Sequence, residues 1–236
     1  MRPDNRANDA HRIIKIIPNF MVYPEGSALI EYGQTKVICT ATVLEEVPPF
    51  LKNSGAGWIT AEYAMLPRST LTRTKRERQK VNGRTYEIQR LIGRSLRCVV
   101  DTHVLGERTI YIDCDVVCAD GGTRTASITG GFVAMALACQ KMVQEGEFSK
   151  NPVFDYVAAM SLGRVNNQLL LDLEYSEDVE AQVDMNVVMT ASQKIIEIQA
   201  TAEKKAFTQA EMNEMLELGW KGVQSAIAMQ REVVTL

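Results

Sequence analysis

The sequence predicts an α+β fold in which antiparallel or mixed sheets pack against helices. Strand-like runs followed by a helix-like run occur twice along the 236 residues, which is the order expected of such a layered structure. Hydrophobic residues make up 46% of the chain and charged residues 23%, a balance that suffices for a sizeable core. Because no Gly/Ser-rich linker or repeat divides the chain, we expect a single domain over residues 1–236.

The first half is predicted to form strands and then helices. Residues 28–32, 35–43 and 58–65 are rich in β-branched and aromatic residues, which favours strands. Residues 85–100 carry apolar side chains at helical spacing with arginines on the other side. Residues 109–118 alternate as a strand, and residues 125–143 indicate a helix. Gly130 and Gly131 should each cost that helix about 1 kcal/mol, so we expect close packing against a sheet to compensate.

The second half repeats this order. Residues 157–165, 169–175, 183–190 and 195–201 are expected to be strands because they are short and rich in β-branched and apolar residues. A final helix is expected from Thr208 to Val223 or beyond. Thr208 and Glu211 have the spacing of a capping box, which marks its start.

Composition excludes several classes of function. The apolar run 130–139 is too short to span a bilayer, and the polar N-terminus lacks a signal-type segment, so we expect no membrane association. Five cysteines without a Cys-x-x-Cys pair favour free thiols and a cytoplasmic location. Neither of the two histidines lies in a nucleophile motif, so a hydrolytic triad is not expected.

The segment Asp120-Gly121-Gly122-Thr123-Arg124 predicts a small-anion site. It follows a strand and opens a helix, so its glycines can turn tightly while the helix start offers N–H groups and a positive dipole. The guanidinium of Arg124 suits phosphate oxygens, and Arg84 stands at the start of the preceding helix. The alternative is a plain strand-to-helix turn with surface arginines.

A basic stretch predicts a polyanionic partner. Residues 66–97 contain ten Lys and Arg against two Glu, although the whole chain has a net charge of −3. The loop between the strand and the helix is expected to contact the phosphate backbone of a polyanion, the alternative being a solvated face. Its basic residues are Arg68, Arg73, Lys75, Arg76, Arg78 and Lys80.

Two carboxylates are candidates for a metal site. Asp184 begins an apolar strand, where a buried charge needs compensation, and Asp178 is expected on the preceding turn. Two carboxylates with phosphate oxygens and waters suit Mg²⁺, with Mn²⁺ remaining possible. The neighbouring Glu177 and Glu180 are interpreted as members of a solvated acidic turn.

The chain resembles the ribonuclease PH family over nearly its whole length. The resemblance rests on long stretches, among them MRPDNR, GWITAEYAMLPRST, GRTYEIQRLIGRSLR, LGERTIYIDCDVVCADGGTRTASITGG and LLLDLEYSEDVEAQVDMNVVMT. It implies a fold like domain 2 of ribosomal protein S5 and a homo-hexamer built as a trimer of dimers. It also implies a phosphorolytic 3′-to-5′ exoribonuclease that trims precursor tRNA and other RNA 3′ ends and is a reversible tRNA nucleotidyltransferase.

The resemblance also implies roles for particular residues. Inorganic phosphate, the co-substrate, would be bound by Arg84, Gly122, Thr123 and Arg124. Asp178 and Asp184 would hold the divalent metal and act in catalysis with the two arginines, and Arg68, Arg73 and Arg76 would grip tRNA. Two alternatives are a non-catalytic RNA-binding ring subunit of an exosome-like assembly and a small-molecule phosphate-binding protein. The chain departs from the family pattern at Asn5 and at Ala200, where glycines are usual, and in the hairpin 190–193.

Overall fold

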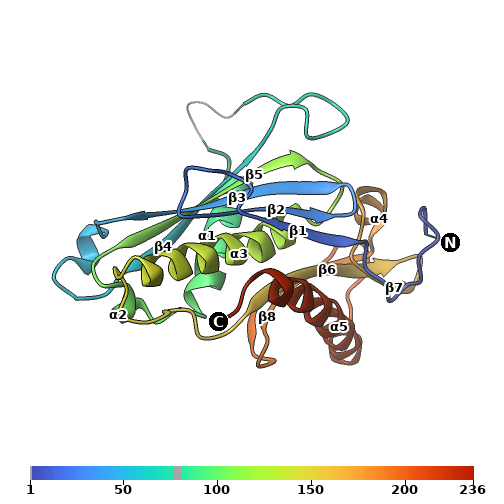
Figure 1. Ribbon diagram of the computed structural model, residues 1–236. Helices are drawn as coiled ribbons and strands as arrows, with labels where there is room; N and C mark the ends of the chain where they lie inside the picture. The colour runs from blue at the N-terminus through green and yellow to red at the C-terminus, as the bar shows by residue number, and fades with distance from the viewer. Residues whose placement is uncertain (1, 77–80) are drawn as a thin grey trace.

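The computed structural model describes residues 2–76 and 81–236, which form two sheets with helices between and around them (Figure 1). The larger sheet has the strand order β1-β2-β3-β5-β4, with β4 parallel to β5 and the other neighbours antiparallel. Its strands are β1 (Ile14–Pro18), β2 (Gly26–Tyr32), β3 (Thr35–Leu44), β4 (Trp58–Met65) and β5 (Thr109–Cys118).

The smaller sheet is antiparallel throughout and has the order β7-β6-β8-β9. Its strands are β6 (Val157–Val165), β7 (Gln168–Leu171), β8 (Val183–Thr190) and β9 (Ile195–Ala202). The two sheets together confirm the predicted α+β class with mixed pairing.

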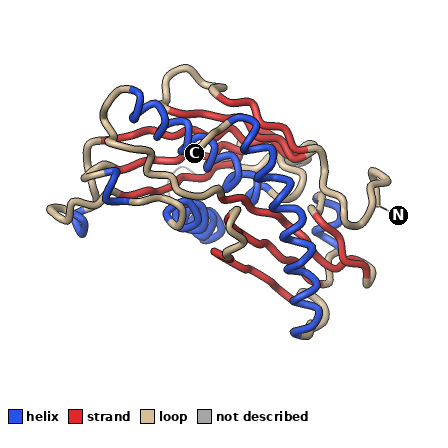
Figure 2. Tube along the Cα trace, turned by 60° about the horizontal axis from the view of Figure 1, so that its bottom comes forward, coloured by secondary structure: helices blue, strands red, loops and turns tan. Residues whose placement is uncertain are grey.

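The helices are α1 (Gly83–Arg97), α2 (Thr102–Leu105), α3 (Thr123–Gln144), α4 (Tyr175–Glu180) and α5 (Gln209–Val233). Helix α3 contacts β2 and β3 of the larger sheet and β6 of the smaller one, so it lies between them, as the tube view also shows (Figure 2). Helix α1 packs on β4, and α5 packs on β6.

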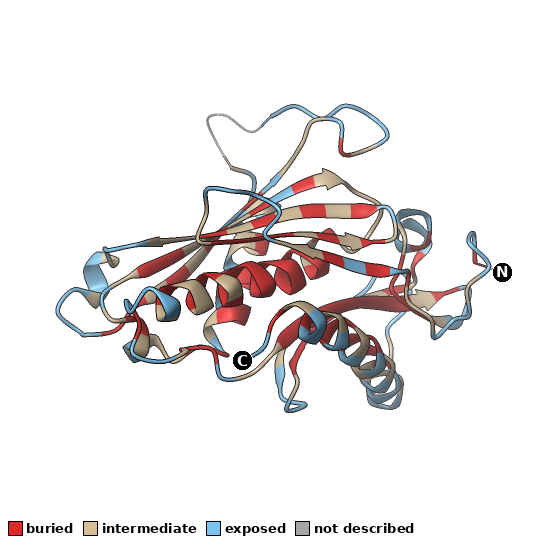
Figure 3. Ribbon diagram, in the orientation of Figure 1, coloured by how far each residue is buried: buried red, intermediate tan, exposed pale blue. Residues whose placement is uncertain are grey.

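Helix α3 is the central element of the core. It is buried along most of its length, whereas the outer end of α5 is largely exposed (Figure 3). Among the described residues it is the one helix long and apolar enough to cross a membrane, and 78% of that apolar window is buried inside the protein. A Cβ at Gly130 would lie 2.6 Å from Cγ2 of Ile30, so this glycine allows the close packing on the larger sheet that the sequence predicted.

Most predicted elements are confirmed, with two corrections. The strand expected over 169–175 is wrong beyond Leu171, because Asp172 takes a left-handed backbone conformation (φ 56°) and α4 begins at Tyr175. Asp178 therefore lies on a short helix and not on a turn. Strand β1, helix α2 and a 3₁₀ turn (Pro49–Leu51) were not predicted. Asn5 stands where the family resemblance leads us to expect glycine, and its φ of 60° lies in the left-handed region that glycine favours.

Candidate active site

All the residues predicted to bind phosphate or metal line one cavity of about 340 Å³. Helix α3 and the turn before it contribute Gly121, Gly122, Thr123 and Arg124, and α1 contributes Arg84. Helix α4 and strand β8 contribute the two aspartates. The structure therefore brings together residues spread over a hundred positions of the chain, namely Arg84, Gly122, Thr123, Arg124, Asp178 and Asp184.

The turn before α3 is shaped by two glycines. Gly121 and Gly122 have φ values of +75° and +66°, a left-handed conformation that L side chains rarely adopt. A Cβ at Gly121 would lie 2.4 Å from the carbonyl oxygen of Leu173. Gly122 is the N-cap residue of α3 and, as a glycine, has no side chain that could accept a hydrogen bond from the first N–H groups of the helix. The first turn of α3 therefore faces the cavity as a helix start suited to an anion.

Thr123 is held from the larger sheet. Its Oγ1 lies 2.9 Å from the hydroxyl of Tyr63 on β4, and both side chains are buried. Burial raises the pKa of Tyr63, so its hydroxyl stays protonated at neutral pH. If Tyr63 donates to Thr123, the threonine proton remains free to donate to an anion in the cavity.

Arg124 is fixed by two side chains from other elements. Its Nη1 lies 3.1 Å from Oε1 of Glu87 on α1 and also donates to Oε1 of Gln199 on β9. The amide of Gln199 donates in turn to Glu87 at 3.2 Å. These contacts limit the rotamers of a long side chain, so the guanidinium is pre-oriented rather than mobile.

Arg84 approaches from the first turn of α1. Asn82 caps that helix by accepting a hydrogen bond from the backbone N–H of Thr85 at 2.8 Å. Arg84 is exposed and lines the cavity, and its positive charge acts on both Asp178 and Asp184. It therefore provides a second cation opposite the carboxylates.

The two aspartates form the acidic side of the cavity. Burial and the charge of Asp178 raise the pKa of Asp184 to about 6, although Arg124 and Arg84 act in the opposite direction. Asp178 is exposed to solvent and lines the same cavity, and its partial desolvation also raises its pKa. A cation bound between these two carboxylates would stabilise their ionised forms.

Oxygen donors of this kind fit Mg²⁺. No group of three His, Cys, Asp or Glu side chains suited to a metal occurs in the described part of the chain. A cation between Asp178 and Asp184 would therefore complete its shell with water and substrate oxygens, as Mg²⁺ commonly does.

Glu177 corrects the interpretation of the acidic segment. Its side chain is 5% exposed and pairs with Arg2, so it does not belong to a solvated turn. Glu180, in contrast, is exposed as expected. The side chain of Glu177 points away from the cavity that Asp178 lines.

The described part of the predicted basic loop, up to residue 76, rises from the body after β4 (Figure 1). Arg68, Arg73 and Arg76 are exposed on it and do not line the cavity, whereas Arg78 and Lys80 lie outside the described residues. The base of the loop is joined to the site because the N–H of Ala119 donates to the carbonyl of Ser69 at 2.8 Å. Thr70 and Thr74 of the loop line the cavity.

Sequence reasoning missed several residues of the site. Ser161 on β6 and Asn186 on β8 are paired across the smaller sheet and line the cavity, and the hydroxyl of Ser161 has no partner within the described structure. Asp184 and Asn186 are two positions apart on one strand, so they share a face, and this alternation was the available signal. Tyr63, Glu87 and Gln199 carried no comparable signal because their partners are distant in sequence.

Comparisons with known proteins cover almost the whole chain. Residues 10–140 match the profile of the 3′ exoribonuclease family, domain 1, and residues 155–222 match domain 2 of the same family. The chain is 57% identical over 235 residues to ribonuclease PH of Syntrophomonas wolfei, covering 99% of this chain and 98% of that one. It is 56% identical over 236 residues to ribonuclease PH of Bacillus pumilus, with the same coverage.

Solved structures share the fold at low sequence identity. Rice (Oryza sativa) Rrp46 superposes with a TM-score of 0.79 at 16% identity over 98% of both chains. The Archaeoglobus fulgidus exosome with RNA bound to the active site gives a TM-score of 0.81 at 20% identity, over 95% of this chain and 90% of that one.

Proposed function

This chain belongs to the 3′ exoribonuclease family that includes ribonuclease PH, and we propose that it is a phosphorolytic 3′-to-5′ exoribonuclease. Its substrate is the 3′ end of precursor tRNA, and it acts as a reversible, phosphate-dependent tRNA nucleotidyltransferase. The observation that carries the proposal is the single cavity in which Arg84, Arg124 and the start of α3 face Asp178 and Asp184.

The attacking group in this reaction is inorganic phosphate. A phosphate oxygen attacks the phosphorus of the 3′-terminal phosphodiester, the bond from phosphorus to the 3′ oxygen breaks, and a nucleoside 5′-diphosphate leaves. Hydrogen phosphate carries the proton that the released 3′ hydroxyl requires. The nucleophile is already anionic, so the chain needs no serine, cysteine or histidine base.

The chain's contribution is to bring two anions together. Arg124, pre-oriented by Glu87 and Gln199, and Arg84 neutralise and aim the phosphate, while Thr123 donates to it from the helix start. Charge-assisted hydrogen bonds of this kind contribute about 1.5–3 kcal/mol each. Because Arg124 is already held by Glu87 and Gln199, little reorganisation is needed when the phosphate binds.

Asp178 and Asp184 are the residues that would hold Mg²⁺, or alternatively Mn²⁺. Such an ion, when bound, offsets the negative charge of the phosphodiester and of the leaving oxygen. In the chain alone, burial and the charge of Asp178 raise the pKa of Asp184. A nearby cation would favour the ionised carboxylate, so this pair of aspartates is suited to hold one.

RNA binding is assigned to the basic loop. Arg68, Arg73 and Arg76 are exposed, and the loop base borders the cavity at Thr70 and Thr74. Phosphates of the RNA body would contact the arginines while its 3′ end enters the cavity. The alternative of a non-catalytic ring subunit has less support, since all four charged residues of the proposed machinery line one cavity.

The assembly and location are proposed on separate grounds. A homo-hexamer, arranged as a trimer of dimers, follows from the family, and similar folds occur in the archaeal exosome core. A mass of six 26.3 kDa chains in solution is the expected result of light scattering. A cytoplasmic location is consistent with five free cysteines, including Cys39 and Cys114, whose sulfur atoms lie 3.8 Å apart and form no disulfide.

One assay tests the function. RNA with a free 3′ end is incubated with Mg²⁺, with and without inorganic phosphate, and the products are separated as mono- or diphosphates. Diphosphates that form only with phosphate are expected. Monophosphates released without phosphate would show hydrolysis instead, and RNA binding without turnover would favour the non-catalytic subunit.

A further inference from the structure

The N-terminal segment buries two arginines against the helix that carries Asp178. The Arg2 and Arg6 side chains are 3% and 9% exposed, although neither belongs to a strand or helix. Burying a guanidinium is costly unless it is paired and hydrogen-bonded. The groups that pair with these two arginines therefore identify the part of the fold to which the N-terminal segment is attached.

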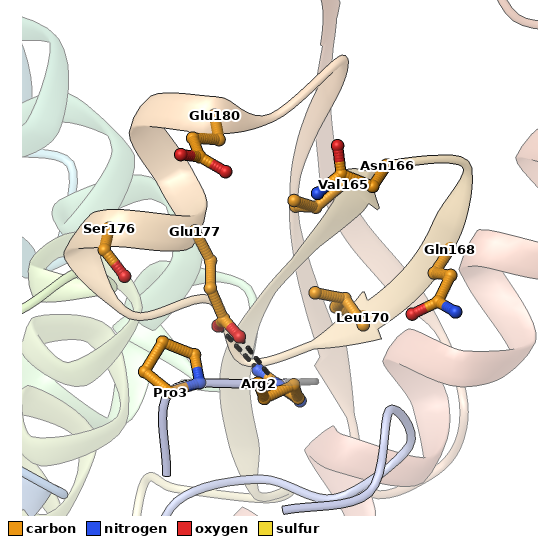
Figure 4. A pocket seen from close by; sticks show the side chains of 9 residues that line it. All are labelled: Arg2, Pro3, Val165, Asn166, Gln168, Leu170, Ser176, Glu177 and Glu180. Atoms are coloured by element: carbon orange, nitrogen blue, oxygen red, sulfur yellow. Dashed lines mark hydrogen bonds and ion pairs between the residues drawn. The ribbon is translucent and has the colours of Figure 1, made fainter. Parts of the chain in front are cut away.

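Arg2 grips Glu177 with two parallel contacts. Nε lies 2.7 Å from Oε1 and Nη2 lies 2.8 Å from Oε2, a bidentate pair that Figure 4 shows between the N-terminal segment and α4. Nη2 of Arg2 also donates to the carbonyl of Asp172 at 3.0 Å. Arg6 adds contacts to the same two residues, at 3.1 Å to Oε2 of Glu177 and 2.7 Å to the Asp172 carbonyl.

The Arg2–Glu177 pair joins the N-terminal segment to the buried side of helix α4. This helix has six residues, all described, and Glu177 is the one buried among them. A helix this short has little stability of its own, so its placement comes from tertiary contacts. Glu177 also closes the capping box of α4 by accepting from the N–H of Glu174 at 3.1 Å. The next residue, Asp178, lines the cavity on the other side.

We propose that Arg2 and Glu177 are positioning residues, which anchor α4 and thereby set the place of the Asp178 carboxylate opposite Asp184. Arg6 supports the same anchor. The inference rests on the proposed function for its catalytic consequence, but the placement of a cation ligand can be measured separately. The phosphate cradle belongs to α3 and should be affected much less.

The experiment compares Arg2→Ala, Arg2→Lys and Glu177→Gln with the full-length chain. The control is Asp9→Ala, which removes the exposed ion pair between Asp9 and Lys221 in the same N-terminal segment. Mn²⁺ binding is titrated by electron paramagnetic resonance without RNA. Phosphorolysis is then measured as a function of Mg²⁺ and of phosphate, and Tm is recorded for each variant.

Arg2→Ala should weaken Mn²⁺ binding about tenfold or more and raise the half-saturating Mg²⁺ concentration similarly, with the phosphate KM changed less than threefold. Arg2→Lys, which keeps the charge but not the bidentate contact, should lie between Arg2→Ala and the parent chain. Asp9→Ala should behave as the parent. If Arg2→Ala lowers Tm below the assay temperature, Arg2→Lys and Glu177→Gln are compared in its place.

Two results would overturn the inference while leaving the proposed function intact. One is unchanged Mn²⁺ binding in every Arg2 and Glu177 variant. The other is a parallel loss of phosphate and metal affinity, which would indicate general loosening of the fold. If the parent chain shows no phosphate-dependent turnover, the proposed function fails, and the Mn²⁺ titration alone still decides the positioning role.

Discussion

At the scale of single residues, Arg124 shows how neighbouring side chains orient a charged group toward the cavity. Glu87 and Gln199 fix its guanidinium at the cavity, and neither partner is near it in sequence. The pairing with Glu87 leaves part of the fork available, because only Nη1 is engaged among the described contacts.

Replacing Arg124 by Ala should raise the phosphate KM and reduce turnover on the order of tenfold to a hundredfold, since one charge-assisted contact to the nucleophile is lost. RNA affinity, measured by filter binding, should persist. Arg108→Ala is the matched control, because Arg108 pairs with Glu147 outside the cavity. Equal losses in both variants would contradict the assigned role.

Asp184 is held at a cost to stability. Its pKa is raised from 3.8 to about 6, so the folded chain binds a proton more tightly than the unfolded chain. Stability from this group therefore falls as pH rises from about 4 to about 6, and stays lower above, by at most about 3 kcal/mol. Functional carboxylates commonly carry such a penalty.

Asp184→Asn should consequently raise Tm at pH 7 in the presence of a chelator, and the gain should shrink as the pH approaches 4. The same variant should lose stabilisation by Mg²⁺ and phosphorolytic activity. Calorimetry across this pH range provides the measurement, with Glu217→Gln on the exposed face of α5 as control. A gain that is equal at pH 4 and pH 7 would rule out the electrostatic cause.

At the scale of elements, the turn between β5 and α3 depends on Gly121. Ala at this position would strain a backbone with φ +75° and place its Cβ 2.4 Å from a backbone oxygen. Gly55 has a similar φ of +69° with nothing within 4 Å, so Gly55→Ala isolates the strain alone.

We expect Gly55→Ala to cost about 1–2 kcal/mol in the free energy of unfolding and Gly121→Ala about 2–5 kcal/mol, because the second adds a clash. Gly121→Ala should also raise the phosphate KM, which Gly55→Ala should not. Urea unfolding and steady-state kinetics measure both effects. Equal costs would mean that the turn can shift away from Leu173.

The basic loop is the element proposed to bind RNA. Arg73→Ala combined with Arg76→Ala should weaken precursor tRNA binding and flatten the logarithmic salt dependence by about 1.4, since each single-strand phosphate contributes about 0.7. Turnover of a very short RNA should be nearly unchanged. A loss confined to short substrates would place these arginines at the reacting end instead.

The elements that could be predicted are those with a local sequence signal of their own. Strands β4, β5, β6 and β8 have the predicted bounds: β5 is marked by alternation, and the other three by runs of β-branched, aromatic or apolar residues. Helix α4 could not be predicted, because its one buried side chain is a glutamate and no apolar pattern marks it. Glu177 was misinterpreted for the same reason, since its partner Arg2 is 175 residues away. The residues that line the cavity could be chosen from their chemistry, but Glu87 and Gln199, which hold Arg124 there, could not.

At the scale of the whole molecule, ion pairs join the N-terminus to the second half of the chain. Arg12 contacts both carboxylate oxygens of the fully buried Asp172, at 3.0 and 2.7 Å, and also the carbonyl of Asp120. Burial opposes ionisation of Asp172, but hydrogen bonds and charge from Arg12 outweigh it and lower its pKa. The contacts with Arg2 likewise lower the pKa of Glu177 against its burial.

These lowered pKa values predict acid sensitivity. A carboxyl group whose folded pKa is depressed stabilises the chain above its unfolded pKa, about 4, and that contribution is lost as the pH falls further. The free energy of unfolding in urea should therefore decrease steeply below about pH 4. Glu177→Gln should flatten the decrease, and an unchanged slope would exclude the contribution of this pair.

The burial of α3 has a consequence for how a polymer can be shortened. The proposed phosphate site is the first turn of a helix that lies between the two sheets, so it cannot move along with a receding RNA end. Under the proposed reaction, each cycle therefore has to draw the RNA forward by one nucleotide toward this fixed site. The distance moved in each cycle is then set by the spacing of nucleotides along the RNA, because the site on the protein stays in place.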